Sequence, residues 1–153
     1  MRRVLFKLLA LIAFLSCSSE VPTERNVISG DFALESINGQ PLPFIDFLAP
    51  LTGDTLFITA GDLSVLSRGR VRIVRHSQWR PRNAPAMPVT TDTTVNAYEI
   101  EGDYAYIHYP TGGLQGAYSD TLEIQDNSLI MRQLVNRHNL GHFWRTLHFV
   151  KHQ

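Results

Sequence analysis

Histidine side chains are the first candidates for chemistry, because four of the six histidines lie near the C-terminus, as His138, His142, His148 and His152. A zinc site needs three or four ligands that converge on one point. On a β-strand, a rise of about 3.3 Å per residue places His142 and His148 roughly 20 Å apart, which is too far to share a metal ion. His138 and His142 do not form the helical His-Glu-x-x-His pattern of a zinc protease. We therefore predict surface histidines and no metal site.

Enzyme motifs would be the next source of chemistry. The sequence contains no Gly-x-Ser-x-Gly motif, no phosphate-binding loop and no dinucleotide-binding glycine motif. Its 14 basic and 14 acidic side chains give a net charge of zero, whereas nucleic-acid binding usually requires a basic excess. We predict a protein that is not an enzyme, needs no cofactor and does not bind nucleic acid.

An arginine-rich stretch could bind an anionic partner, such as a phosphate-bearing envelope lipid or a polysaccharide. It contains Arg68, Arg70, Arg72, Arg75, Arg80 and Arg82. Alternatively, it is a solvated strand face whose charges are paired across the sheet. A regular hairpin would place Arg72 opposite Glu99. The same register would place Arg70 opposite Glu101, and such pairs are mildly stabilising. We prefer this pairing for Arg70 and Arg72, and we keep Arg80 and Arg82 as a candidate anion patch.

The single cysteine, Cys17, follows an apolar run from Leu8 to Leu15, which itself follows a positively charged start. A charged segment, a short apolar run and small residues at the cleavage site are the features of a secretory signal. The run is too short to span a bilayer, which takes about 20 apolar residues. With one cysteine, the chain cannot form an internal disulfide.

The segment Leu15-Ser16-Cys17 resembles the lipobox of bacterial lipoproteins, in which the cysteine becomes the first mature residue and carries the lipid. The resemblance implies a signal peptide over residues 1–16, lipidation of Cys17 and a flexible tether over residues 17–27. Several acyl chains would hold the protein stably on a membrane. We expect a lipid-anchored envelope protein that faces the periplasm. Ser18 resembles the residue found there in lipoproteins sent to the outer membrane, so the outer membrane is the expected location. The alternative is an ordinary cleaved signal with an incidental cysteine, and therefore an exported protein.

Residues 28–153 consist of short runs of alternating apolar and polar residues, separated by turn residues, with no amphipathic helix. Turn signals include Asn38-Gly39, Gly61-Asp62 and Gly102-Asp103, and three prolines mark Arg80–Asp92 as a long loop. Antiparallel strands at such spacing must hide their edges, and closure into a barrel removes them. We predict an all-β domain that forms a single up-and-down antiparallel barrel of about eight strands.

Gly30-x-Phe32 in the first strand and Arg145 in the last resemble the calycin or lipocalin-like pattern, in which Gly-x-Trp opens the barrel. The resemblance implies that the Arg145 guanidinium packs across the Phe32 ring at the closed end. The opening phrase Phe32–Pro43 also resembles that of small uncharacterised lipocalin-like bacterial lipoproteins. The alternative for Arg145 is an ordinary strand arginine with its charged end at the surface.

A barrel of about eight strands is either filled by side chains or holds one small ligand. We expect Leu42–Leu51 to form a loop across the open mouth, as an apolar lid or as a plug. The candidate cavity residues are Leu34, Ile58, Tyr98, Tyr104, Tyr106 and Phe143. The sequence thus predicts a lipid-anchored barrel that binds a small apolar or amphipathic molecule. The alternative is a non-catalytic structural or interaction protein of the envelope with a filled barrel.

Overall fold

The chain is all-β wherever its structure, a computed structural model, describes it, namely over residues 28–109, 119–137 and 141–152. The strands are β1 (Asp31–Ile37), β2 (Gln40–Pro41), β3 (Phe44–Leu48), β4 (Thr55–Leu66), β5 (Arg70–Arg80), β6 (Thr90–Glu101), β7 (Tyr104–His108), β8 (Ser119–Ile124), β9 (Ser128–Arg137) and β10 (Gly141–Lys151). Within the described ranges no helix could cross a membrane. The predicted signal peptide, the lipidation site Cys17 and the tether lie outside these ranges.

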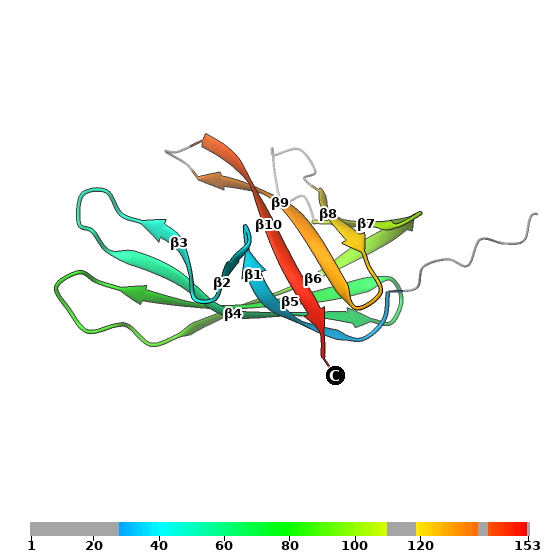
Figure 1. Cartoon of the computed structure of the whole chain (residues 1–153), viewed down its shortest axis with the longest axis horizontal. Helices are drawn as coiled ribbons and strands as arrows, with labels where there is room; N and C mark the ends of the chain where they lie inside the picture. Colours follow the sequence, from blue (N-terminus) through cyan, green and yellow to red (C-terminus); the bar gives the residue numbers. More distant parts are fainter. Residues whose placement is uncertain (1–27, 110–118, 138–140, 153) are drawn as a thin grey trace, which may run out of the picture.

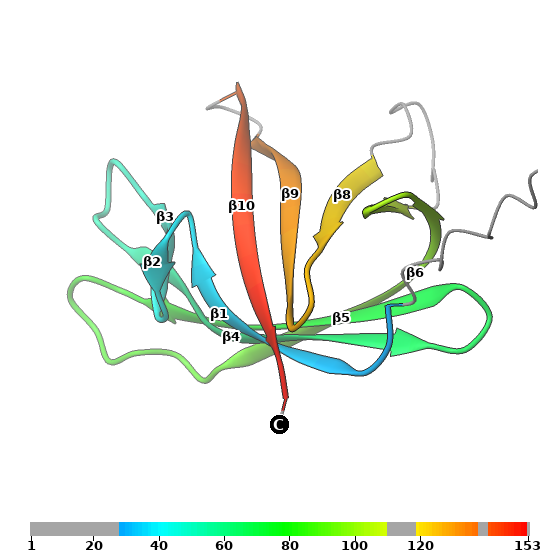
Figure 2. The same ribbon diagram turned by 45° about the vertical axis from the view of Figure 1, so that its right-hand side comes forward.

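Eight strands form a closed antiparallel barrel, which confirms the predicted fold class (Figure 1). Neighbouring strands pair in the order β4-β5-β6-β7-β8-β9-β10-β1, and β1 pairs with β4 to complete the circle. In Figure 2, β8, β9 and β10 rise side by side above the long strands β4 and β5. The two extra strands are β2, which pairs antiparallel with β1, and β3, which pairs antiparallel with β4.

The closing contact is short and lies at one end of the barrel. Asp31–Ala33 of β1 pairs with Asp62–Ser64 of β4. Beyond these pairs the two strands separate, and β2 and β3 border the separation. The turn between β1 and β2 is the predicted Asn38-Gly39 turn, with φ values of 52° and 74°, which suit these two residue types. The barrel is therefore closed by direct pairing at one end only.

The predicted chain break at Gly61-Asp62 is wrong, because β4 continues through both residues. The irregularity in β4 is instead a bulge just before Ala60. Gly61 serves close packing: a Cβ built on it would lie 3.1 Å from Leu34 Cδ2 and 3.2 Å from the Val74 carbonyl oxygen. The missing side chain therefore lets β1 pack closely on β4 inside the barrel.

The predicted pairs, Arg72 with Glu99 and Arg70 with Glu101, are also wrong. These arginines lie opposite Val95 and Ala97 of β6, and both glutamates pair with β7 residues across the next ladder. The first residues of β6 were assigned to the proline-rich loop. In the structure they pair with β5, and the register therefore shifts by four residues, from Glu99 to Val95.

The segment Leu42–Leu51, expected to be a loop across the mouth, contains β3, which pairs with β4 at the edge of the sheet. A bulge between Ile45 and Phe47 leaves Asp46 outside the regular pairing. Phe44 packs against the core, whereas the next side chain, Ile45, is 54% exposed. The apolar side chains of this segment therefore alternate between the core and the solvent as in a strand, and they do not pack into the barrel mouth as a loop.

The hydrophobic core consists of inward-facing residues from alternate positions of the barrel strands, as the two-residue period of a strand requires. Its buried members are Ile28, Phe32, Leu34, Ile37, Ile58, Leu63, Val71, Ala105, Ile107, Leu122, Leu129, Met131, Leu147 and Phe149. Arg145 is buried on the same face of β10 as Leu147, so the core includes a charged side chain that needs a partner.

Leu63 tests the closing contact, because it is fully buried and pairs with Phe32 where β4 meets β1. Leu63→Ala should lower the free energy of unfolding by about 2–5 kcal/mol, since it removes buried methyl groups and leaves a cavity. Leu48→Ala is the matched control, because Leu48 is 57% exposed on β3 and surface changes usually stay within about 0.5 kcal/mol. Urea unfolding followed by circular dichroism measures both. Similar losses in the two variants would contradict a structural role for the closing contact.

Candidate ligand cavity

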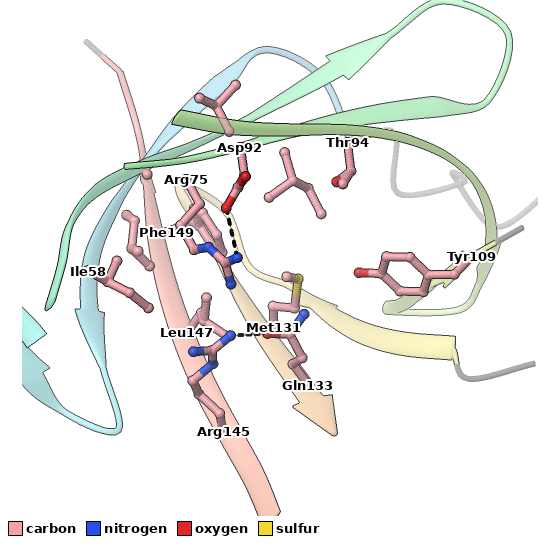
Figure 3. A pocket seen from close by; sticks show the side chains of 14 residues that line it. Ile58, Arg75, Asp92, Thr94, Tyr109, Met131, Gln133, Arg145, Leu147 and Phe149 are labelled. Carbon is pink, nitrogen blue, oxygen red and sulfur yellow. Dashed lines mark hydrogen bonds and ion pairs between the residues drawn. The ribbon is translucent and has the colours of Figure 1, made fainter. Parts of the chain in front are cut away.

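A cavity of about 130 Å³ lies inside the barrel (Figure 3). It is lined by Leu34, Ile58, Gly61, Ile73, Val74, Arg75, Asp92, Thr94, Tyr109, Met131, Gln133, Arg145, Leu147 and Phe149. Apolar side chains from β1, β4, β5, β9 and β10 form most of the wall, and polar side chains approach from β5, β6, β9 and β10. A concave, mostly apolar site with a few convergent polar groups is the usual form of a small-molecule site.

Arg145 is the most deeply buried of the charged groups at the cavity. Its Nη1 donates to Asp46 Oδ1 at 2.7 Å, and the two side chains are only 4% and 15% exposed. Asp46 is the residue that the bulge in β3 leaves outside the ladder. Bulges commonly redirect a side chain in this way. Here the bulge lets Asp46 of the extra strand β3 neutralise Arg145 of β10 across the gap where β1 and β4 separate.

A hydrogen-bonded chain continues from Arg145 along the inner face. Arg145 Nη2 donates to Gln133 Oε1, and Gln133 Nε2 donates to Asp120 Oδ2 at 2.9 Å. The Tyr109 hydroxyl donates to the same carboxylate oxygen at 2.5 Å. Four side chains from β8, β9, β10 and the end of β7 are thus connected, and such networks hold their members in fixed positions.

Burial shifts the pKa values of two side chains in this hydrogen-bonded chain, Asp120 and Tyr109. It raises the pKa of the Asp120 carboxyl above its ordinary value of 3.8, although hydrogen bonds from Tyr109 and Gln133 oppose the shift. Burial, followed by the neighbouring Asp120 charge, also raises the pKa of Tyr109. The tyrosine hydroxyl therefore remains protonated at physiological pH and acts as a donor.

A second ion pair lies at the cavity and joins β5 to β6. Its two side chains are labelled in the upper half of Figure 3. Arg75 Nη2 lies 3.1 Å from Asp92 Oδ2, with side-chain exposures of 43% and 62%. This pair is more exposed than Arg145–Asp46, and water screens it more strongly. Both arginines at the cavity are therefore matched by an aspartate.

The predicted cavity residues divide into two groups. Leu34 and Ile58 line the cavity inside the barrel. Tyr98 packs against the core without lining the cavity. Phe143, at the far end of β10, is 36% exposed and does not line it either.

Tyr104 and Tyr106 were placed on the inner face, and that prediction is wrong. The buried residues of β7 are Ala105 and Ile107, so strand alternation turns both tyrosines outward. Tyr104 lines a groove on the outer surface together with Trp144. Ala105 and Ile107, which alternate with the two tyrosines, fill the core on this strand in place of the rings.

The predicted contact between Phe32 and Arg145 is also wrong. Phe32 lies opposite Lys151 of β10, six residues beyond Arg145, which a strand rise of about 3.3 Å converts to roughly 20 Å. Phe32 is buried near the closed end, whereas Arg145 lies at the cavity. Arg145 is not a surface arginine either, because it pairs with Asp46 inside the fold.

The other candidate sites lie away from the cavity. The Arg80 guanidinium lies 4.4 Å above the Phe57 ring, and the Arg82 backbone N–H donates to Asp54 Oδ1. These two arginines remain a predicted anion patch.

The predicted surface position is confirmed for His148 and His152, which lie near Glu35 and Asp62 with side-chain exposures of 36% and 56%. His138 lies outside the described residues. Among the described residues, no three potential metal-binding side chains lie together.

Sequence reasoning did not assign Asp46, Asp120, Gln133 or Asp92 to the cavity or its hydrogen-bonded chain, and it considered Arg75 only as part of the arginine-rich stretch. A usable signal existed for two of them. Asp120 and Gln133 occupy inward positions in the alternation of β8 and β9, next to buried Leu122 and Met131 in that phase. A polar residue at a core position usually has a partner. Asp46 had no such signal, because its direction depends on a bulge.

Comparison with known proteins found no matching family model, no matching curated protein and no matching solved structure. The class of the protein is therefore defined by its own fold: an antiparallel eight-stranded β-barrel with two extra strands and an internal cavity. This architecture is compatible with a lipocalin-like barrel and with ligand binding.

The raised pKa of Asp120 predicts how stability depends on pH. In the unfolded chain this carboxyl loses its proton near 3.8, whereas the folded chain keeps it to higher pH. The folded state thus binds more protons, and the Asp120 contribution to stability falls as pH rises from about 3.8 through the folded pKa. Asp120→Asn should remove this decline and flatten the curve of unfolding free energy against pH.

Urea unfolding at several pH values measures this curve. Asp126→Asn is the matched control, because Asp126 is exposed in the turn after β8. An Asp120→Asn curve with the same slope as the parent curve would contradict the proposed effect of burial.

Proposed function

We propose that this chain is a lipocalin-like lipoprotein of the cell envelope, anchored through a lipid on Cys17 and facing the periplasm. Its barrel binds a small apolar or amphipathic molecule, and it catalyses no reaction and uses no cofactor. The anchoring part of the proposal is supported by the lipobox-like segment at Cys17. The binding part is supported by the cavity inside the barrel.

The observation that carries the binding proposal is the two-sided lining of the cavity. Leu34 and Phe149 contribute to an apolar wall, while Tyr109, Gln133 and Arg145 present hydrogen-bonding groups. An engineered apolar cavity of about 150 Å³ binds benzene. A cavity of about 130 Å³ therefore suits one ring or one short chain with a polar end.

The second candidate is an interaction protein with a filled barrel. The outer surface favours it, because a groove of about 480 Å³ is lined by Tyr104, Ile130 and Trp144 among others. Tyr104 and Trp144 are 45% and 66% exposed, and exposed aromatic side chains are typical of interfaces. This candidate would act through its surface and would need no ligand.

Native mass spectrometry distinguishes the two candidates. The mature protein, purified from its own envelope extract, should show a discrete extra mass that disappears on denaturation. Hexan-1-ol and hexanoic acid are soluble probes of suitable size for the emptied cavity. A clean mass with no uptake of either probe would reject the ligand-binding function in favour of the filled barrel.

Methionine methyl groups locate the bound molecule. Met131 lines the cavity, whereas Met87 is 52% exposed outside it. With ¹³C-labelled methionine methyl groups, addition of hexan-1-ol should shift the Met131 resonance and leave Met87 unchanged. Met131→Leu assigns the resonance. A shift of Met87 alone would place binding outside the barrel.

Cys17→Ser tests the anchor separately. The parent chain, which keeps Cys17, should fractionate with membranes and carry the mass of a lipid. The Cys17→Ser variant should lose the lipid mass and the stable anchoring that several acyl chains provide. Ser18→Ala is the control, since it leaves the cysteine in place. A parent chain without lipid mass would contradict the lipoprotein proposal and leave the cavity proposal untouched.

A further inference from the structure

Exposed apolar side chains gather at one end of the barrel. Among the described residues, ten large hydrophobic side chains are exposed, and six of these lie on β3, on the end of β5 and in the loops that follow these strands. They are Ile45, Leu48, Leu51, Trp79, Met87 and Val89, with Leu51 99% exposed. We call these six residues the apolar tip. Scattered single apolar residues are normal on a surface, but a concentration such as this one usually marks an interaction site.

Strand pairing holds the apolar tip together. Leu48 lies opposite Thr55 of β4, and Thr55 lies opposite Arg80 of β5. Phe47 and Trp79 pack edge to face, with ring centroids 6.2 Å apart. The tip is therefore a three-stranded end of the sheet, and Figure 1 shows β3, β4 and β5 extending together in this direction.

The exposed side chains lie on both faces of this end. Ile45 follows Phe44, which packs against the core, so alternation turns Ile45 outward. Trp79 lies opposite Leu56, two residues before the buried Ile58, and so belongs to the inner side. Leu51 and Met87 lie in the two loops at the end. A single protein partner covers one face, whereas insertion of the end into a lipid surface covers both faces and the loops.

Two arginines border the apolar side chains. Arg80 lies above the Phe57 ring, and Arg82 is the second residue of the loop that contains Met87. Asp54, in the loop before β4, accepts a hydrogen bond from the Arg82 backbone N–H. Tryptophan side chains favour the region of lipid headgroups, and arginine forms paired hydrogen bonds with phosphate. This combination fits anionic phospholipid.

We propose that the apolar tip inserts into the headgroup region of a membrane that contains anionic phospholipid, with Leu51, Trp79 and Met87 below the phosphates and Arg80 and Arg82 at their level. An interfacial segment of this kind binds through its apolar area and through attraction to anionic lipid. The inference does not depend on a ligand in the cavity.

The reach of the N-terminal segment is compatible with this orientation. Strand β4 runs twelve residues from Thr55 at the tip to Leu66, which corresponds to about 40 Å. Leu66 is adjacent to Val65, whose N–H donates to the Gly30 carbonyl near the start of the described chain. The eleven residues 17–27 span up to about 40 Å when extended. A lipid on Cys17 and the apolar tip can therefore meet the same membrane.

The two tryptophans of the chain provide the test. In full-length chain, Trp144→Phe leaves Trp79 in the tip as the only tryptophan, and Trp79→Phe leaves Trp144, which is 66% exposed on β10. Vesicles of phosphatidylethanolamine and phosphatidylglycerol carry bromine on their acyl chains as a quencher. Vesicles of phosphatidylcholine with the same label serve as the uncharged comparison.

Trp79 should shift to shorter emission wavelength and lose at least half of its fluorescence to the brominated lipid, while Trp144 should remain unquenched. Leu51→Ser should reduce the Trp79 quenching several-fold without affecting stability, because Leu51 is fully exposed. The double variant Arg80→Gln and Arg82→Gln should abolish the difference between the two vesicle types. Equal quenching of Trp79 and Trp144 would overturn the proposal. A Trp79 shift that rises with protein concentration in the absence of vesicles would also overturn it, because the tip would then bind a second copy of the chain.

Discussion

The three residue pairs between β1 and β4 are the constraint on which the rest of the architecture depends. They join the first barrel strand to the last free edge, so the backbone hydrogen-bonding groups of both strands find partners. The contact cannot extend further, because β1 next pairs with β2 and β4 next pairs with β3. The barrel therefore has a seam that opens away from its closed end. The apolar side chains at the outer end of β3 and β5 lie on the β3 side of this seam, and the Arg145–Asp46 ion pair bridges it.

The Arg145–Asp46 pair stabilises the fold across the seam. A buried charge without a partner is destabilising by several kcal/mol, and Arg145 is 4% exposed. The pair therefore links two segments that are 99 residues apart in the chain. In the part of the chain that the structure describes, β3 pairs with β4 alone, so this ion pair and the packing of Phe44 are among the contacts that hold it against the barrel.

The sequence was sufficient for the class of fold but not for the details of the site. Alternation and turn residues predicted the barrel and the Asn38-Gly39 turn, because both signals are local. The register between β5 and β6 depends on the exact bounds of the proline-rich connection, and the predicted register is off by four residues. Tyr104 and Tyr106 were placed on the inner face as side chains that could line a cavity, whereas Ala105 and Ile107 fill the core. Asp46 could not be found, since a bulge determines its direction.

The paired charges also limit what the proposed cavity can hold. Of the described residues at its wall, Arg145 is matched by Asp46 behind it and Arg75 by Asp92. Asp120, behind the wall residues Tyr109 and Gln133, already accepts a hydrogen bond from each of them. A carboxylate entering this space would add a buried negative charge beside aspartates, with both arginines already engaged. A hydroxyl or an amide would add hydrogen bonds without adding a charge. The electrostatics of the wall therefore favour a molecule whose polar end is uncharged.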